Sequence, residues 1–196
     1  MHPDIATITR IVRSRRSIKP AAMEANREIP RPLLDTLLEN ATWAPTHGIT
    51  EPWHFTIFSN DSRRLLATTL QSLYQKHTLP PDFRPEKFEK LGRNPLLAPV
   101  VFAIGATPGS NPKIPEIEEI EAVACAVQNI HLTASAAGLG AFWSSPPITA
   151  HPEFVEFIGL AKTDRCLGLL YLGWPKDDIP LPTSKRRPAA EKTTWR

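Results

Sequence analysis

Apolar residues recur every three or four positions in several segments, which predicts amphipathic helices there. The first segment follows Asp4, whose carboxylate can cap a helix, and another follows Asp61 in the same way. A third begins at Pro30 and Pro32, where a helix tolerates proline because its first N–H groups have no helical partner. The helices expected from this pattern cover residues 4–14, 31–42, the segment after Asp61 that carries Leu65, Leu66, Leu70 and Leu73, 85–92 and 152–158.

The longest helix is expected over residues 115–138. Its first half alternates polar and apolar positions through Glu116 to Glu121, whereas its second half, AVACAVQNIHLTASAAG, is apolar or small all round. Residues 122–152 contain no Asp, Glu, Lys or Arg. Because a helix that is apolar on every side is buried on every side, we expect the second half to lie in the protein interior.

Short apolar runs rich in β-branched and aromatic residues predict four strands. They lie at residues 53–58, 100–104, from 141 onward and at 166–173. Helices and strands do not alternate strictly along the chain, so the expected fold class is α+β rather than doubly wound α/β. The 196 residues correspond to one domain, residues 1–196.

Two segments of the chain are polar and broken by proline. Residues 77–98 are expected to form a variable loop or lid. Residues 175–196 form a basic, proline-rich tail that cannot fold on its own. Proline accounts for 21 of the 196 residues, but 5 Trp and 8 Phe argue against disorder.

Composition excludes several classes of protein. A net charge of +3 is too small for a dedicated nucleic-acid binder, and no apolar run is long enough to span a membrane. The start of the chain lacks the apolar region of a signal peptide, so a cytoplasmic location is expected. Cys125 and Cys166 stand alone, which predicts no disulfide and no metal site but two reduced, buried thiols. The chain contains no GxGxxG, Walker A or HExxH motif.

Three features could carry chemistry. The first is a run of cations, Arg10, Arg13, Arg15, Arg16 and Lys19, which is either a solvated helix end or an anion site assisted by the hydroxyl of Ser17. The second is the stiff loop 44–53, and the third is the segment 138–146, in which two glycines and Trp143 precede two serines. Core packing is an alternative role for the aromatic residues of both segments. The indication of a functional site comes from the three features taken together.

With these three features combined, the sequence resembles the FMN-dependent nitroreductase family. The matching segments cover nearly the whole chain. Residues 15–18 are similar to its N-terminal RRS motif, and residues 44–55 to its AP(S)xxNxQPW(x)F segment. Residues 124–143 resemble its long central helix and GLG-x-x-W turn, and residues 169–175 its late strand with a Gly-x-Pro turn. His47 and the Trp-Ser-Ser sequence at 143–145 suggest the compact bacterial branch.

The resemblance implies a nitroreductase-like fold, with a central, mainly antiparallel sheet, flanking helices and a long buried helix. It also implies an intertwined homodimer with two FMN sites at the subunit interface and with the tail packed on the partner. The residues that would contact FMN are Arg15, Arg16 and Ser17 from one chain, Trp43 and His47 from its partner, Trp143, Ser144 and Ser145, and Arg187 of the Lys185 to Arg187 cluster in the tail.

The chain departs from the family pattern in the second motif. The common Asn and Gln are replaced by a stretch that holds His47 and Glu51. A negative charge at Glu51 near the site would disfavour reduced flavin unless an arginine pairs with it.

The function that the resemblance implies is an oxidoreductase in which NAD(P)H reduces FMN, and FMN then passes electrons to a nitroaromatic, quinone or similar acceptor by a ping-pong mechanism. One alternative is a specialised flavin enzyme of the same fold, such as a dehydrogenase, a dehalogenase or a flavin-degrading enzyme. The other is a non-catalytic nucleic-acid binder that uses the arginine cluster, which would show a steep salt dependence.

Overall fold

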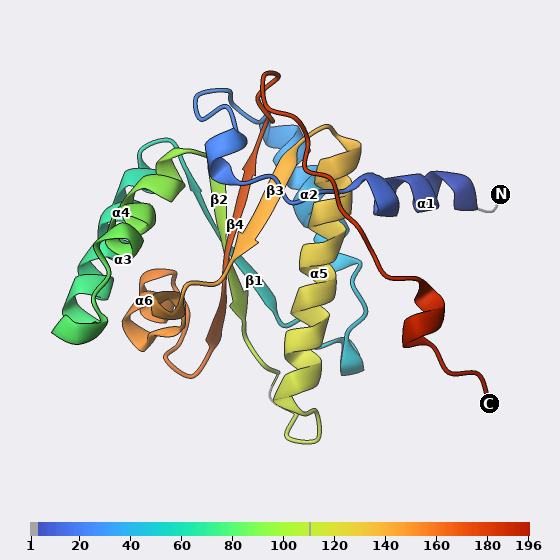
Figure 1. Ribbon diagram of the computed structural model, residues 1–196. Helices are drawn as coiled ribbons and strands as arrows, with labels where there is room; N and C mark the ends of the chain where they lie inside the picture. Colours follow the sequence, from blue (N-terminus) through green and yellow to red (C-terminus); the bar gives the residue numbers. More distant parts are fainter. Residues whose placement is uncertain (1–3, 110) are drawn as a thin grey trace.

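A single antiparallel sheet runs through the middle of the molecule (Figure 1). The computed structural model describes residues 4–109 and 111–196, and within them the sheet has four strands in the order β1-β2-β4-β3. All three strand pairs are antiparallel, which confirms the expected α+β class. The strands are β1 (Trp53–Ser59), β2 (Val100–Ala106), β3 (Gly140–Ser144) and β4 (Arg165–Gly173).

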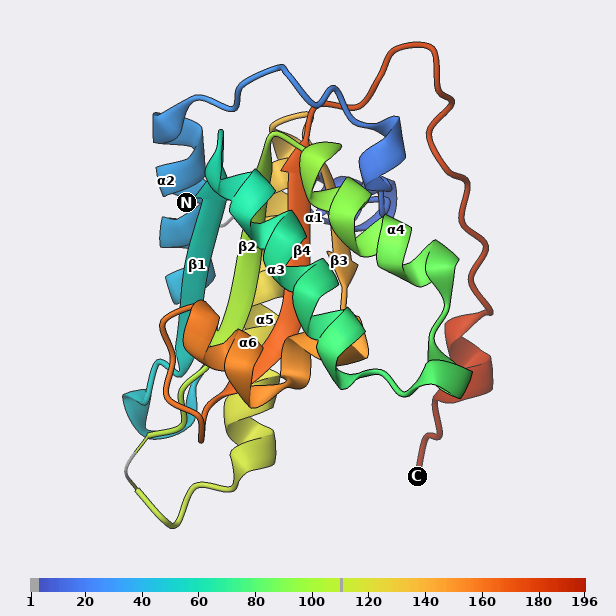
Figure 2. The same cartoon turned by 90° about the vertical axis from the view of Figure 1, so that its left-hand side faces the viewer.

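Helices cover both faces of the sheet (Figures 1 and 2). Helices α2 (Arg31–Thr42) and α5 (Glu116–Ala136) pack on one face, and α3 (Ser62–His77), α4 (Pro85–Arg93) and α6 (Pro152–Phe157) lie on the other. Helix α1 (Ile5–Ser14) extends away from the body. Short 3₁₀ turns occupy Pro20–Ala22, His47–Ile49, Pro80–Asp82, Asn94–Leu96, Pro147–Ala150 and Ala189–Lys192.

The central strand β2 is buried along its whole length and serves both layers. Phe102 and Ile104 pack toward α2 and α5, whereas Val101 and Ala103 pack toward α3 and α6. Successive side chains of a strand point to opposite faces, so a strand between two helical layers must be apolar at every position. This explains the uninterrupted apolar run in the sequence.

The predicted elements agree closely with the observed ones. Asp4 caps α1 as expected, because its carboxylate accepts a hydrogen bond of 3.0 Å from the N–H of Ala6. Asp61 holds the N-cap position of α3, but its carboxylate accepts no capping hydrogen bond, and the Ser62 hydroxyl instead bonds the backbone of Ser59. The segment 77–98, expected to be a loop or lid with one short helix, contains α4 and two 3₁₀ turns.

Within one copy of the chain, helix α5 is buried on one side only, so this chain alone does not provide the burial expected on every side. Val123, Ala126, Val127 and Ile130 are buried against α2 and the sheet. The opposite stripe, formed by Ile117, Glu121, Cys125 and Gln128, is exposed. Cys125 is therefore an exposed thiol, contrary to expectation, while Cys166 is buried as predicted. The physical reason is that a single copy of the chain supplies cover for only one side of the helix.

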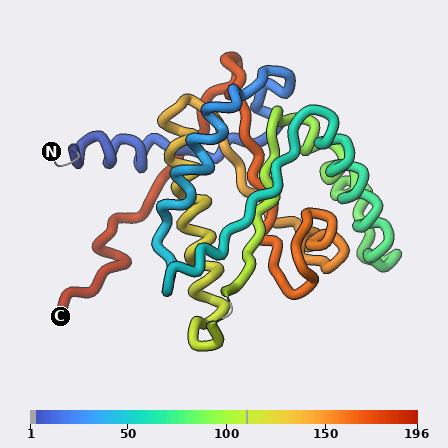
Figure 3. Tube along the Cα trace, turned by 180° about the vertical axis from the view of Figure 1, so that it is seen from behind, coloured from blue at the N-terminus to red at the C-terminus, as the bar shows by residue number. Residues whose placement is uncertain are grey.

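Both ends of the chain lie outside the packed layers (Figure 3). Helix α1 has no buried residue, and Ile5, Ile8 and Val12 are all at least half exposed. Residues 177–196 are exposed throughout. Within the described residues, no helix combines the length and the apolar composition needed to cross a membrane.

Candidate functional site

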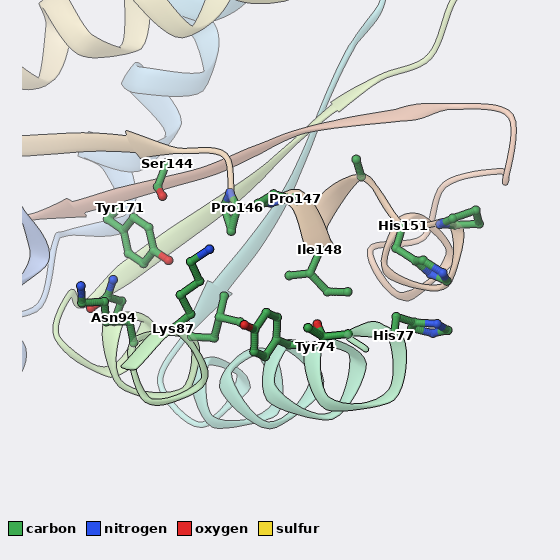
Figure 4. Close-up of a pocket in the computed structure, with 15 residues that line it drawn as sticks. Tyr74, His77, Lys87, Asn94, Ser144, Pro146, Pro147, Ile148, His151 and Tyr171 are labelled. Carbon is green, nitrogen blue, oxygen red and sulfur yellow. The ribbon is translucent and has the colours of Figure 1, made fainter. Parts of the chain in front are cut away.

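A cavity of about 660 Å³ opens between α3 and α4 on one side and the ends of β3 and β4 on the other (Figure 4). Its floor includes Ser144, a residue expected to contact the cofactor, and Tyr171 of β4. The residues that line it are Tyr74, His77, Thr78, Lys87, Lys90, Leu91, Asn94, Ser144, Pro146, Pro147, Ile148, Ala150, His151, Pro152 and Tyr171.

The polar groups of this cavity are two lysines, several hydroxyls, the amide of Asn94 and the imidazoles of His77 and His151. Lys87 and Lys90 lie three residues apart on α4 and therefore on the same side of that helix. No carboxylate lines the cavity, and neither lysine forms an ion pair within residues 4–109 and 111–196. Burial raises the pKa of the Tyr171 phenol well above its usual value, so this hydroxyl keeps its proton. The cavity is thus suited to a ligand with negative charge or electron-rich oxygens.

Sequence reasoning missed Lys87, Lys90 and Tyr171. A signal was present, because PEKFEKLGR places its lysines on one side of a short helix within the segment already expected to form a lid. Tyr171 lies in an apolar strand, where the sequence pattern predicts that a tyrosine belongs to the hydrophobic core.

The position of Ser144 depends on a bulge in β4. The pairing of β2 with β4 shifts at Ile104 and Gly105, so that Leu167 has no partner in β2. The carbonyl oxygen of Leu167 accepts a hydrogen bond of 2.9 Å from the indole N–H of Trp143. Gly168 has φ of +119°, and a side chain there would collide with the Ser144 carbonyl oxygen. Glycine therefore allows the end of β3 to lie close to β4.

The arginine segment follows α1 and lies alongside β3. Ser17 pairs with Ala141, and the N–H of Ile18 donates to the Ala141 carbonyl oxygen at 3.0 Å. The guanidinium of Arg16 donates to the carbonyl oxygens of Arg13 at 2.6 Å and Arg15 at 2.8 Å. Arg16 therefore satisfies orphan carbonyls at the helix end, which is the structural role considered for the cluster.

The charge of Arg15 acts on a buried histidine of α5. His131 is 7% exposed, and its Nδ1 atom has no hydrogen-bond partner. Burial, together with the positive charge of Arg15, lowers the pKa of His131 to about 4. The imidazole is accordingly neutral at physiological pH.

His47 lies near the other end of α5, whereas Trp43 comes one helical turn after Asn40, which forms hydrogen bonds with Asn129 and Thr133 of α5. Trp43 follows α2 and is 79% exposed. The Nδ1 atom of His47 lies 2.6 Å from the Oε2 atom of Glu118, and both side chains are largely exposed. The loop is held from beneath by the buried carboxylate of Glu119, which accepts hydrogen bonds from the Thr50 hydroxyl at 2.6 Å and the Gly109 N–H at 3.0 Å.

Glu51 lies in the same loop as an exposed residue with φ of +47°. Its side chain forms no ion pair with any residue that the structure describes. The positive φ is a conformation that a glutamate rarely adopts, and the Thr46 hydroxyl supports it by accepting a hydrogen bond of 3.2 Å from the Glu51 N–H.

One chain does not bring all the predicted contacts together. Glu118 contacts His47, and the charge of Arg15 lowers the pKa of His131. These two residues of α5 are 13 positions apart, which corresponds to about 20 Å at 1.5 Å per residue. Ser145 follows Ser144 at the end of β3, whereas Arg187 lies in the exposed tail. Arg15 to Ser17 thus lie with Trp143 to Ser145 along β3, His47 lies at the far end of α5, and Trp43 follows the end of α2.

A model of the nitroreductase family matches residues 12–174. Among curated proteins, the chain is 30% identical over 188 residues to YfhC of Bacillus subtilis, whose name assigns it to the NAD(P)H nitroreductases. The match covers 94% of this chain and 91% of YfhC. The chain is also 25% identical over 199 residues to the iodotyrosine deiodinase of Hydra vulgaris, covering 91% of this chain and 68% of that protein.

Solved structures show the same fold. A nitroreductase-like protein from Bacillus cereus superimposes with a TM-score of 0.79 and 26% identity, covering 100% of this chain and 98% of the other. The FMN-dependent nitroreductase NfnB from Mycobacterium smegmatis, solved in complex with NADPH, superimposes with a TM-score of 0.74 and 18% identity, over 98% and 100% of the two chains. Together with the match across residues 12–174, these findings establish that the chain belongs to the nitroreductase family.

Proposed function

We propose that this protein is an FMN-dependent oxidoreductase that takes electrons from NAD(P)H and passes them to a nitroaromatic, a quinone or a similar acceptor. The observation that carries the proposal is the cationic cavity that ends at Ser144. Membership of the nitroreductase family and the FMN and NADPH named for NfnB support it.

The residues present fit a flavin. Small-molecule sites have volumes of roughly 300–1,000 Å³, and the cavity, at about 660 Å³, lies within that range. Leu91, Ile148 and Pro147 offer apolar walls to a planar ring, while Lys87 and Lys90 offer positive charge. When bound, FMN supplies hydride acceptance and electron transfer, and the protein supplies position and electric field.

The roles of the surrounding residues follow from their charges. A cation near the electron-poor ring favours its reduced, negatively charged form, which is the task we assign to the cavity lysines and to Arg15. Ser144, Ser145 and Ser17 orient the ligand through hydrogen bonds. Apolar walls exclude water, which strengthens each of these electrostatic interactions. In the ping-pong sequence, oxidised NAD(P) leaves before the acceptor enters the same space.

We further propose that the complete site needs two chains of a homodimer. The exposed stripe of α5, the uncovered helix α1 and the exposed tail are three surfaces that one chain leaves open. A partner that covers them would bring its Trp43 and His47 to the group formed by Arg15, Ser17 and Ser144. The tail would carry Arg187 to the other chain. Residues 1–196 would act as one domain, in which residues 77–98 form a lid.

A second candidate is a specialised dehalogenase of the same fold. The 25% identity to the Hydra vulgaris iodotyrosine deiodinase over 91% of this chain favours it among the specialised alternatives. Steady-state assays with nitrofurazone and menadione separate the two functions. Turnover of either acceptor supports the general oxidoreductase, whereas bound FMN with turnover of neither, together with reductive dehalogenation of an iodinated phenol, supports the second candidate.

The FMN proposal is tested by the absorbance spectrum of the purified protein and by titration with FMN. Replacing Arg15 by alanine should weaken FMN binding by about 1–3 kcal/mol, since a charge-assisted hydrogen bond is lost. Arg13→Ala is the matched control, because it removes an exposed cation from the last turn of the same helix. Wild-type protein that stays colourless in excess FMN would refute the proposal. A negligible loss in Arg15→Ala, as in Arg13→Ala, would instead assign the cluster to the solvated helix end.

A further inference from the structure

A cluster of three possible metal ligands lies at one end of the cavity and has no part in the function proposed above. His77 is the last residue of α3, His151 precedes α6, and Glu153 lies in the first turn of α6. Each offers one ligand atom, and the three atoms lie within 4.8 Å of one another. Figure 4 shows the rings of His77 and His151 next to each other at this end of the cavity.

The distances are close to those of a metal centre. The His77 Nε2 atom is 2.9 Å from the Glu153 Oε1 atom, and the two imidazole rings stack with centroids 3.8 Å apart. A tetrahedral zinc ion with bonds of about 2.0–2.1 Å places its ligand atoms about 3.3 Å apart. The side chains of His77 and Glu153 are 26% and 39% exposed, so small rotations can bring the donors to this spacing.

The carboxylate of Glu153 is prepared for this role. The Lys76 ammonium donates to Oε1 at 3.0 Å and to Oε2 at 2.8 Å. The same ammonium also competes with any cation for the carboxylate.

We propose that His77, His151 and Glu153 bind a divalent transition-metal ion such as zinc, which ties the end of α3 to the start of α6. Two imidazoles and one carboxylate form a donor set that suits such ions, and water completes the tetrahedron. The metal replaces the proton shared by His77 Nε2 and Glu153 Oε1, and His77 then carries its proton on Nδ1. Lys76 keeps its hydrogen bond to Oε2.

His151 also gives up an existing interaction in this arrangement. Its Nδ1 atom accepts a hydrogen bond of 3.2 Å from the Glu153 N–H, so the neutral ring carries its proton on Nε2. A metal takes either the Nδ1 lone pair or, after the proton moves, the Nε2 lone pair, and both choices remove this helix cap. Because α3 and α6 both border the cavity, the metal would fix the spacing of its two sides.

Calorimetric titration of the untagged, chelator-treated full chain with ZnCl₂ tests the proposal, with MgCl₂ as the control ion. We expect one zinc per chain and an affinity at least about tenfold lower in His77→Ala and in His151→Ala, as expected for the loss of a ligand. His54→Ala is the matched control, since it removes an exposed histidine from β1 and should bind as the wild type does. Absence of zinc binding, or equal binding in all four proteins, overturns the proposal.

A second variant guards against a loss caused by misfolding. Lys76→Gln should bind zinc several times more tightly, because it removes the cation that competes for Glu153. Zinc should also raise the Tm of the wild type but leave that of His77→Ala unchanged, with far-UV circular dichroism showing that each variant is folded. If Lys76→Gln binds zinc no better than the wild type, Glu153 is not a ligand and the three-ligand site is wrong.

Discussion

Strand β2 and the outer stripe of α5 differ in composition and in surroundings, because β2 is apolar and buried throughout, whereas the stripe mixes apolar with polar residues and is exposed. Phe102 of β2 and Leu170 of β4 are fully buried between two helical layers of their own chain. Ile117 and Cys125 on the outer stripe of α5 are exposed. The difference teaches that an apolar pattern predicts burial without telling which molecule supplies the cover. The interior is covered by this chain, and we propose that the α5 stripe is covered by another copy.

The largest expected effect comes from emptying the interior. Phe102→Ala should lower the free energy of unfolding by about 3–5 kcal/mol, because it removes a fully buried ring and leaves a cavity. Urea denaturation followed by circular dichroism measures the loss. Ile8→Ala on the uncovered helix α1 is the control, for which a change within about 0.5 kcal/mol is expected in protein diluted to single chains. Similar losses for both would mean that the two regions are not distinct.

The next effect concerns the boundary between the two regions, where His131 is buried beneath Arg15. The pKa of His131 is about 4 in the folded chain, whereas its ordinary value is 6.5. Between these two pH values, therefore, only the unfolded chain binds the proton. Stability should therefore fall as the pH falls, by about 2 kcal/mol between pH 7 and pH 5.

Parallel denaturant titrations at the two pH values measure this loss. His131→Leu should lose about 2 kcal/mol less than the wild type over the same interval. His54→Leu, at an exposed position of β1, should behave like the wild type. An unchanged pH dependence in His131→Leu would show that other groups govern the acid sensitivity.

The smallest effect expected is on association. Cys125→Arg places a charge in the middle of the exposed α5 stripe and should weaken dimerisation at least about tenfold, or 1.4 kcal/mol. Sedimentation velocity over a range of concentrations measures it. Thr68→Arg adds the same charge to an exposed position of α3 and should leave the dimer intact. If the wild-type protein sediments as a monomer, the proposal that the complete site needs two chains is wrong.

The sequence predicted the elements well because their signals are local. The apolar run of β2 and the proline at the start of α2 place these elements within one or two residues of their observed ends. Cys125 was misplaced because periodicity shows the apolar sides of a helix but not the number of chains that pack on them.

The candidate site could be predicted only in part. Ser144 was found through its motif, and it does line the main cavity. Lys87 and Tyr171 were missed because they meet through the fold, from elements about 80 residues apart. The same is true of the pair of His77 and His151, which carries no sequence spacing that would indicate a metal.

The central position of β4 also has a consequence for how this protein is made. β4 lies between β2 and β3 in the sheet, yet it comes after both of them in the chain. During synthesis at roughly 5–20 residues per second, β2 therefore emerges and waits for its partner β4 while residues 107–164 are made. In that interval its apolar surface and open edge are exposed, so newly made chains are the form of this protein most in need of a chaperone.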